Sequence, residues 1–312
     1  MKVLVYHRFA HEFSRLIRER FPDLEVAAGH DEGFLSQQIA DADIMLVFEF
    51  PFELLKQATR LRWIQLTSAG AEHLFEARQS LQGILVTNTK GMHANLIADY
   101  TFGAIITLQW NFVDLFLDKQ ARRWGSRAVE PLAGKTLGIV GLGSIGCEIA
   151  RRAKAFQMNV IGVKRDPVPI EGVGKVFGPD QVREMLSLSD FVVVAAALTP
   201  ETYRMIGEQE LRAMKETSYL INIARGRIID ESALIKALQD KRIAGAFLDA
   251  FEMEPLPPDS PLWKLPSVMI TPRIAGILKD YAGGVMEIFG ENLKRWKEGL
   301  PLRNQIDWQK GY

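Results

Sequence analysis

The chain has 312 residues, 47% of them hydrophobic and 24% charged, so it is long enough for two domains with separate cores and has the composition of a soluble globular protein. Its 38 basic residues equal its 38 acidic residues in number, and this balance argues against a nucleic acid or an anionic membrane as the partner. A single cysteine, Cys147, excludes an internal disulfide and is interpreted as a small packing residue rather than a reactive thiol.

The N-terminal apolar run is short. It ends at His7 and Arg8, too early for the core of a secretion signal. Other apolar runs, such as residues 191–198, are much shorter than a membrane span. We therefore expect a cytoplasmic protein whose partner is a small molecule.

The first third of the chain alternates short apolar strands with helical patterns, which is typical of an open α/β unit. Strands are predicted at 2–5, 24–27, 43–47, 63–67 and 84–87, and helices at 9–20, 33–40 and 52–58. After the fourth strand come Ser68, Ala69 and Gly70, whose small side chains leave backbone N–H groups accessible at the carboxyl end of the sheet. An ordinary strand-to-helix turn is the alternative explanation, and the bare sequence favours it over a ligand site.

Residues 94–121 predict one long helix that is apolar over much of its circumference. Such a helix is buried on several sides. It is either the spine between two domains, or a subunit interface, or both.

Residues 135–165 predict a strand, a glycine turn, a helix and a second strand. The strand at 136–140 runs into Gly141-Leu142-Gly143-Ser144-Ile145-Gly146, a GxGxxG sequence. Its first glycine permits a tight turn, the second lets the backbone approach a pyrophosphate, and the third allows close packing of the helix. The helix start adds N–H groups and a positive dipole end. This context predicts a dinucleotide-binding site rather than a structural turn.

The α/β pattern continues to the C-terminus, so residues from about 100 to 280 predict a doubly wound sheet with right-handed connections. Strands are predicted at 191–195, 218–223, 245–249 and 268–271, and helices at 180–186, 208–214, 231–239 and 284–298. We expect the last helix to pack on the first unit.

Three charged residues stand at or just beyond predicted strand ends, where open α/β sheets place ligands: Arg225, Asp249 and Arg273. Arginine presents a planar fork that suits a carboxylate, although a lone arginine is more often a surface ion pair. Asp249 and Glu254 are harder to dismiss as solvated charges, and helix capping is the alternative for Asp249.

Four motifs now agree in order and spacing: the glycine loop, and the runs 222–226 (NIARG), 248–257 (LDAFEMEPLP) and 271–276 (TPRIAG). Together they resemble the D-isomer-specific 2-hydroxyacid dehydrogenases, of the glyoxylate/hydroxypyruvate reductase type, over nearly the whole chain. The resemblance implies a Rossmann nucleotide-binding domain, residues 96–282, inserted into a flavodoxin-like substrate domain, residues 1–95 plus 283–312. It also implies an active site in the cleft between two doubly wound α/β domains, and a homodimer built around the long helix.

The resemblance also implies roles for individual residues. Arg225 looks like the arginine that binds the substrate carboxylate and carbonyl region. Glu254 looks like the glutamate that raises the pKa of the catalytic histidine, and Asp249 resembles the aspartate near the nicotinamide carboxamide. Substrate contacts fall at the backbone amides of Ser68, Ala69 and Gly70, and further cofactor contacts at Thr101, Thr199 and Ala224.

The chain departs from the family at Arg273, because the family has Thr-Pro-His where this chain has Thr271-Pro272-Arg273. Arginine is effectively always protonated, so it is a poor proton donor to a ketone. It can still stabilise a developing alkoxide while water provides the proton, or it can simply pair with Glu254. No other histidine clearly takes over, and His93 is interpreted as structural rather than as a substitute acid.

Lys164 and Arg165 end the second strand of the dinucleotide unit, where basic residues accept a 2′-phosphate. We therefore predict that NADP(H) is preferred, while NAD(H) stays possible if Asp166 is the acidic residue that binds the ribose. Phe48, Phe50 and Phe52 favour an apolar 2-keto acid, although core packing explains any one of them as well.

Two functional hypotheses follow. The first is an NAD(P)H-dependent enzyme that interconverts 2-keto acids and D-2-hydroxy acids, with altered proton chemistry at Arg273 and no metal. The alternative is a catalytically impaired family member that binds the cofactor as a regulator or scaffold. Turnover of NADPH with 2-keto acids distinguishes the two.

Overall fold

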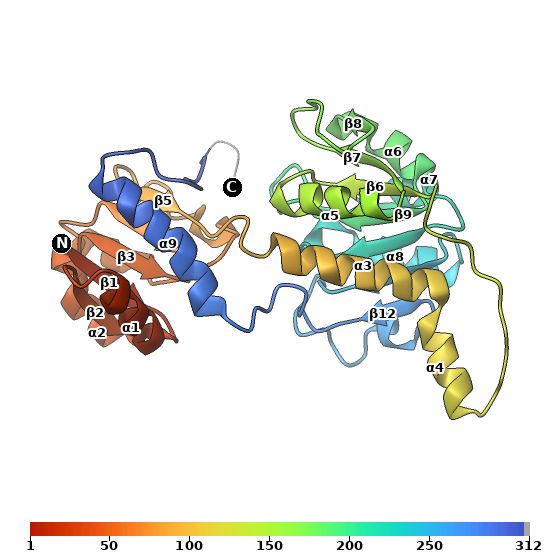
Figure 1. Ribbon diagram of the computed structural model, residues 1–312, viewed down its shortest axis with the longest axis horizontal. Coiled ribbons are helices and arrows are strands. Elements are labelled where there is room, and N and C mark those ends of the chain that lie inside the picture. The colour runs from red at the N-terminus through yellow and green to blue at the C-terminus, as the bar shows by residue number, and fades with distance from the viewer. Residues whose placement is uncertain (309–312) are drawn as a thin grey trace. The chain divides into compact units, whose positions relative to one another are not determined.

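The computed structural model describes residues 1–308, and its chain forms two α/β units (Figure 1). Unit 1 comprises residues 1–92 together with the chain from 278 onward, and unit 2 comprises residues 93–277. The chain therefore leaves the first unit, builds the second one, and returns.

Unit 1 is a five-stranded parallel sheet in the order β2-β1-β3-β4-β5. Its strands are β1 (Lys2–Tyr6), β2 (Glu25–Gly29), β3 (Ile44–Val47), β4 (Trp63–Leu66) and β5 (Leu85–Thr87). Alternate residues face opposite cores: Val3 and Val5 pack under α1 (Ala10–Arg20) and α9 (Tyr281–Lys297), whereas Leu4 packs with α2 (Glu32–Gln38). Both faces are covered, as a parallel sheet requires.

The last helix packs on unit 1, as predicted. Its residues Val285, Phe289 and Leu293 are fully buried in the same core as α1. A buried hydrogen-bond chain adds to this packing: Asn292 Nδ2 donates to Gln65 Oε1 at 3.3 Å, and Thr87 Oγ1 donates to the same oxygen at 2.8 Å. The polar side chains in the middle of the sheet are therefore satisfied by one another and hold α9 in register.

Unit 2 is a seven-stranded parallel sheet in the order β12-β11-β10-β9-β6-β7-β8. Its strands are β6 (Thr136–Val140), β7 (Asn159–Val163), β8 (Lys175–Phe177), β9 (Phe191–Val194), β10 (Tyr219–Asn222), β11 (Gly245–Leu248) and β12 (Val268–Ile270). The helices α3 (Ala94–Trp110) and α5 (Ser144–Ala155) cover one face and lie on the near side in Figure 1. The other face carries α6 (Val182–Leu188), α7 (Glu208–Ala213) and α8 (Glu231–Gln239).

Three helices begin at an aspartate whose side chain caps a backbone N–H of the first turn. Asp31 accepts from Phe34 N at 2.9 Å, and Asp230 accepts from Ala233 N at 3.1 Å. Asp280 caps α9 in the same way through Gly283 N. These local signals explain why the predicted helix starts lie close to the observed ones.

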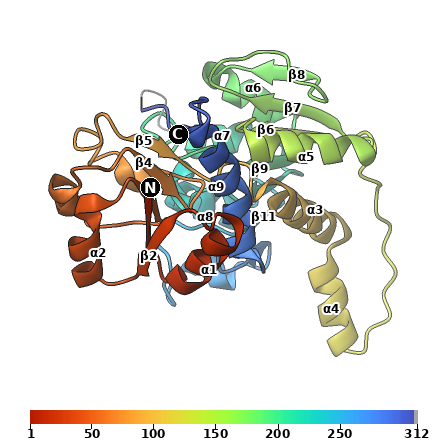
Figure 2. The ribbon, with the colours of Figure 1, turned by 60° about the vertical axis from the view of Figure 1, so that its left-hand side comes forward.

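The prediction of one helix over 94–121 was wrong. Asn111 adopts a left-handed conformation, with φ of 48°, which ends α3 and starts a separate helix α4 (Phe112–Gln120). Asparagine is among the few residues that tolerate this conformation. Figures 1 and 2 show α4 and the segment after it extending away from the sheet, and no residue of α4 is buried.

Two smaller differences concern short elements. Strand β8 was not predicted, and the helix predicted at 52–58 is a 3₁₀ helix, Phe52–Gln57.

None of the helices between residues 1 and 308 combines the length and the hydropathy needed to span a bilayer. The same residues contain no group of three or more histidine, cysteine, aspartate and glutamate side chains placed to hold a metal ion.

Candidate dinucleotide and substrate sites

The loop between β6 and α5 needs its three glycines for three different reasons. Gly141 has φ of 100°, and a Cβ on it would lie 2.6 Å from the Ala196 Cα. A Cβ on Gly146 would overlap the Gly141 carbonyl oxygen, so α5 packs directly on the loop. A Cβ on Gly143, by contrast, would meet nothing within 4 Å, so this position faces open space.

The open side of this loop presents backbone donors. Within residues 1–308, the N–H groups of Leu142 and Gly143 donate no hydrogen bond, and Ser144 is the first residue of α5. A helix N-terminus with accessible N–H groups and no side chain in the way is a binding site for phosphate. The residues present therefore fit a dinucleotide pyrophosphate.

Two basic side chains flank the loop. Strand β7 ends at Val163, so Lys164 and Arg165 follow it directly, while Asp166 is exposed and further along. Lys164 Nζ donates to the Leu142 carbonyl oxygen at 3.4 Å. Arg165 Nη2 lies 3.5 Å from Glu201 Oε2. The positive charges of Lys164 and Arg165 therefore lie where β7 meets the glycine loop.

The other residues predicted to contact the cofactor differ in their surroundings. Thr101 is fully buried in α3, and its hydroxyl donates to Ile97 O of the preceding turn at 2.7 Å. Thr199 is also buried and begins a turn in which its N–H donates to Thr202 Oγ1 at 2.8 Å. Ala224 follows β10 and presents its carbonyl oxygen to two guanidinium groups.

Asp249, directly after β11, anchors the loop that contains Arg273. It is only 3% exposed, and its carboxylate accepts hydrogen bonds from Ile274 N at 2.8 Å and Ala275 N at 3.0 Å. It also accepts from the Thr271 hydroxyl at 2.7 Å. The alternative that Asp249 caps a helix was wrong, because the N–H groups it binds belong to a distant loop.

The hydroxyl of Tyr100 completes this anchor through a short hydrogen bond to the Thr271 hydroxyl. Burial raises the pKa of Tyr100 far above its usual value, so the phenol stays neutral. No local sequence pattern marks Tyr100 as part of this anchor, because helix α3 brings it to this loop from a distant part of the chain.

Arg225 and Arg273 converge on the Ala224 carbonyl, and Glu254 pairs with Arg273. Arg273 Nη1 donates to Ala224 O at 2.9 Å and to Glu254 Oε1 at 3.4 Å, and Arg225 Nη1 donates to the same Ala224 oxygen at 3.1 Å. The ion pair predicted between Arg273 and Glu254 is therefore confirmed. A Cβ on Gly226 would overlap the Phe251 backbone, so only glycine lets the two loops approach this closely.

His93 lies next to the same loop. Its Cδ2 is 3.8 Å from the position that a Cβ on Gly276 would take. Burial lowers the pKa of His93 below its usual value, so the ring is neutral at pH 7 and is a poor proton donor. This supports the structural interpretation of His93.

In unit 1, Ser68, Ala69 and Gly70 follow β4, and their backbone N–H groups donate no hydrogen bond to residues 1–308. Their carbonyl groups are held: Ser68 Oγ donates to Gly70 O at 2.8 Å, and Asn88 Nδ2 donates to Ala69 O at 2.8 Å. Three consecutive accessible N–H groups on a braced turn can bind an anion.

Aromatic residues of unit 1 lie close to this turn. The Tyr281 hydroxyl donates to Thr67 O at 2.7 Å, and its ring stacks on His7 with 6.1 Å between centroids. Phe48 stacks in the same way on His73, whose Nε2 is buried with no hydrogen-bond partner among the described residues. Tyr281 belongs to α9, so only the return of the chain to unit 1 reveals it.

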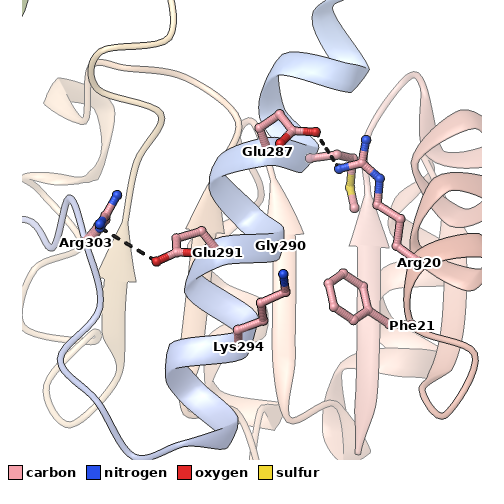
Figure 3. A pocket seen from close by; sticks show the side chains of 8 residues that line it. Arg20, Phe21, Glu287, Gly290, Glu291, Lys294 and Arg303 are labelled. Carbon is pink, nitrogen blue, oxygen red and sulfur yellow. Dashed lines mark hydrogen bonds and ion pairs between the residues drawn. The ribbon is translucent and has the colours of Figure 1, made fainter.

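A surface pocket of about 490 Å³ lies between α1 and α9 (Figure 3). Its charged lining is largely self-paired: Arg20 lies 2.8 Å from Glu287, and Arg303 lies 3.9 Å from Glu291. Because these pairs are open to solvent and neutralise each other, we assign no ligand to this pocket.

The fold and the glycine loop are those of a dinucleotide-binding protein. The sequence profile of the D-isomer specific 2-hydroxyacid dehydrogenase, NAD binding domain, matches residues 102–275. A glyoxylate reductase of Korarchaeum cryptofilum is 36% identical over 275 residues, which cover 84% of this chain and 82% of that protein. The chain belongs to the D-isomer specific 2-hydroxyacid dehydrogenase family, and its relatives are NAD(P)-dependent enzymes.

Solved structures agree along nearly the whole chain. A D-isomer specific 2-hydroxyacid dehydrogenase family protein from Aeromonas salmonicida superimposes with a TM-score of 0.87 at 32% identity, covering 98% of this chain and 99% of that one. The enzyme from Xanthobacter autotrophicus Py2, solved with NADPH and MES, gives a TM-score of 0.88 at 27% identity and covers 100% and 99%. The prediction of two parallel-sheet α/β domains of Rossmann type is confirmed.

Proposed function

We propose that the protein is an NADPH-preferring reductase that converts small 2-keto acids to D-2-hydroxy acids, with Arg273 in the place of the family histidine. The observation that carries this proposal is the cluster of Arg225, Glu254 and Arg273 around the Ala224 carbonyl. Relatives that bear the name glyoxylate reductase support the substrate class. An NADPH complex of a similar structure supports the cofactor.

The loop 141–146 would hold the cofactor pyrophosphate, and Lys164 and Arg165 would hold the 2′-phosphate. Because β7 ends at Val163, these two residues, rather than Asp166, come first after the strand, which favours NADP(H) over NAD(H). When bound, the cofactor supplies the hydride. Asp249 and Ala224 are proposed contacts near the nicotinamide, and Thr101 and Thr199 are further proposed contacts.

The proposed substrate contacts use charge and backbone donors. Arg225 offers a planar fork to the carboxylate and carbonyl region of the keto acid. The N–H groups of Ser68, Ala69 and Gly70 are proposed to bind the carboxylate. Arg273, fixed by Glu254, stabilises negative charge on the reduced oxygen, and water supplies the proton.

The decisive experiment restores the histidine in Arg273→His. NADPH consumption is followed with glyoxylate, hydroxypyruvate and larger 2-keto acids for both proteins. Since a positioned general acid contributes about 10²- to 10⁴-fold, we expect the variant to be faster by at least about 10²-fold, with a pKa near neutrality in its rate profile. A slower variant would show instead that arginine is part of a working site.

The second candidate function is cofactor binding without turnover, as a regulator or scaffold. It is favoured by the bonds that already engage Arg273 Nη1, to Glu254 and to Ala224 O. This alternative predicts tight NADPH binding, no NADPH consumption with any 2-keto acid, and no change in NADPH affinity when a keto acid is added.

We also propose a homodimer that buries α4. Among the exposed large apolar residues, Phe112, Phe116 and Leu117 lie on this helix and are 46%, 55% and 49% exposed. An apolar cluster of this kind on a projecting helix is typical of a protein interface.

A further inference from the structure

We propose that Glu201 tunes cofactor selectivity: its carboxylate competes with the 2′-phosphate of NADP(H) for Arg165. This inference rests on the proposed cofactor site and adds a residue to it. Glu201 lies in the connection after β9 and belongs to none of the motifs that identified the family.

The position of the pair in the sheet carries the inference. Strand β6 lies between β7 and β9 and pairs with both. Arg165 follows β7 and Glu201 follows β9, yet Arg165 Nη2 lies 3.5 Å from Glu201 Oε2. The pair therefore crosses the carboxyl end of β6, where the loop 141–146 begins. A ligand seated on that loop lies next to both charges.

Glu201 lies in a turn that has internal hydrogen bonds. The Thr199 N–H donates to Thr202 Oγ1 at 2.8 Å, and that hydroxyl donates to Ala197 O at 2.7 Å. A hydrogen bond from the Thr199 side chain, together with the nearby Arg165, lowers the pKa of Glu201. The carboxylate is therefore ionised at neutral pH.

Arg165 binds a 2′-phosphate more strongly than it binds the Glu201 carboxylate. A 2′-phosphate carries up to two negative charges and three acceptor oxygens, whereas the carboxylate carries one charge and two oxygens. Arg165 and Glu201 are 33% and 68% exposed, so their pairing is weak and easily replaced. The displaced Glu201 then repels the phosphate. NAD(H) has only a hydroxyl at this position and leaves the pair intact.

The test is Glu201→Gln, which keeps the size and the hydrogen-bonding capacity of the side chain. Adenosine 2′,5′-bisphosphate and 5′-ADP are titrated calorimetrically, and NADPH and NADH by fluorescence. We expect the variant to bind the two 2′-phosphorylated ligands about three- to tenfold more tightly, and to bind 5′-ADP and NADH within about twofold of wild type. Glu171→Gln, which removes an exposed charge from the same unit, is the matched control and leaves all four affinities unchanged.

Equal changes for all four ligands, or no change, would overturn the proposal, because the effect must depend on the 2′-phosphate. In an Arg165→Gln background, Glu201→Gln should not increase the affinity for the 2′-phosphorylated ligands. An increase that persists in that background would show that Glu201 acts without Arg165. If wild type binds NADPH no better than NADH, the proposed NADP(H) preference is wrong. The dissociation constants of adenosine 2′,5′-bisphosphate for Glu201→Gln and for wild type, compared with each other, still decide the role of Glu201.

Discussion

The side chain of residue 273 and its backbone are held by different groups. The guanidinium contacts Glu254 and Ala224 O, whereas Asp249 binds the N–H groups of the next two residues. The sequence predicted the ion pair with Glu254 as one alternative for Arg273. It could not predict the bonds to Asp249, because they depend on backbone atoms of a loop whose path is set by tertiary packing.

The buried side chain of His7 makes the folding stability depend on pH. Burial, and to a smaller extent Arg8, lowers its pKa from 6.5 to about 4. The unfolded chain therefore gains a proton near pH 6.5, while the folded chain stays neutral down to about pH 4. Stability from the neutral ring is present above pH 6.5 and is lost as the pH falls from 6.5 towards 4, by at most about 3 kcal/mol.

Urea denaturation at pH 7.5 and pH 5 checks this for wild type and His7→Asn, in which the amide oxygen replaces the ring nitrogen that accepts from Phe9 N. We expect wild type to lose more stability than the variant between the two pH values. Equal losses would assign the pH dependence to other groups.

Among the elements, the glycine loop was predicted most fully, because the tight turn at Gly141 and the close packing at Gly146 are local requirements that the sequence pattern records, and Gly143 leaves the open side of the loop clear. Helix 94–121 was predicted incorrectly, since its apolar pattern continues through Asn111 although the backbone does not. The turn at Ser68 to Gly70 was recognised as a possible ligand site, but the hydrogen bond from Tyr281 to the Thr67 carbonyl beside it was not predicted. Local patterns therefore located the elements, and tertiary contacts determined what surrounds each site.

The loop glycines give a matched pair of substitutions. A Cβ at Gly143 meets nothing within 4 Å, so Gly143→Ala should leave the thermal midpoint unchanged and raise the NADPH dissociation constant at least about tenfold by blocking the pyrophosphate. Gly146→Ala forces α5 against the Gly141 carbonyl and should also destabilise the fold, by about 1–3 kcal/mol. Calorimetry and cofactor titration separate the two effects, and loss of stability in Gly143→Ala would contradict the prediction.

For the whole molecule, the exposed helix α4 is the feature that an isolated chain does not explain. If two copies bury it, Phe116→Glu should convert a dimer to a monomer in sedimentation equilibrium, because a charge cannot be buried without a partner. Leu188→Glu, at a residue that is also exposed but lies on α6, should leave the mass unchanged. A monomeric wild-type protein would rule out the proposed homodimer.

The way Asp249 holds its loop has a consequence for how such a site can change over time. Asp249 holds the loop through the Thr271 hydroxyl and the N–H groups of Ile274 and Ala275, and not through the side chain of residue 273, so that side chain can be exchanged without rebuilding its support. Arginine, histidine, lysine or glutamine at 273 would then be presented from the same platform. The fold therefore separates the side chain that the site presents from the bonds that support it, and a single substitution at residue 273 would change the first and keep the second.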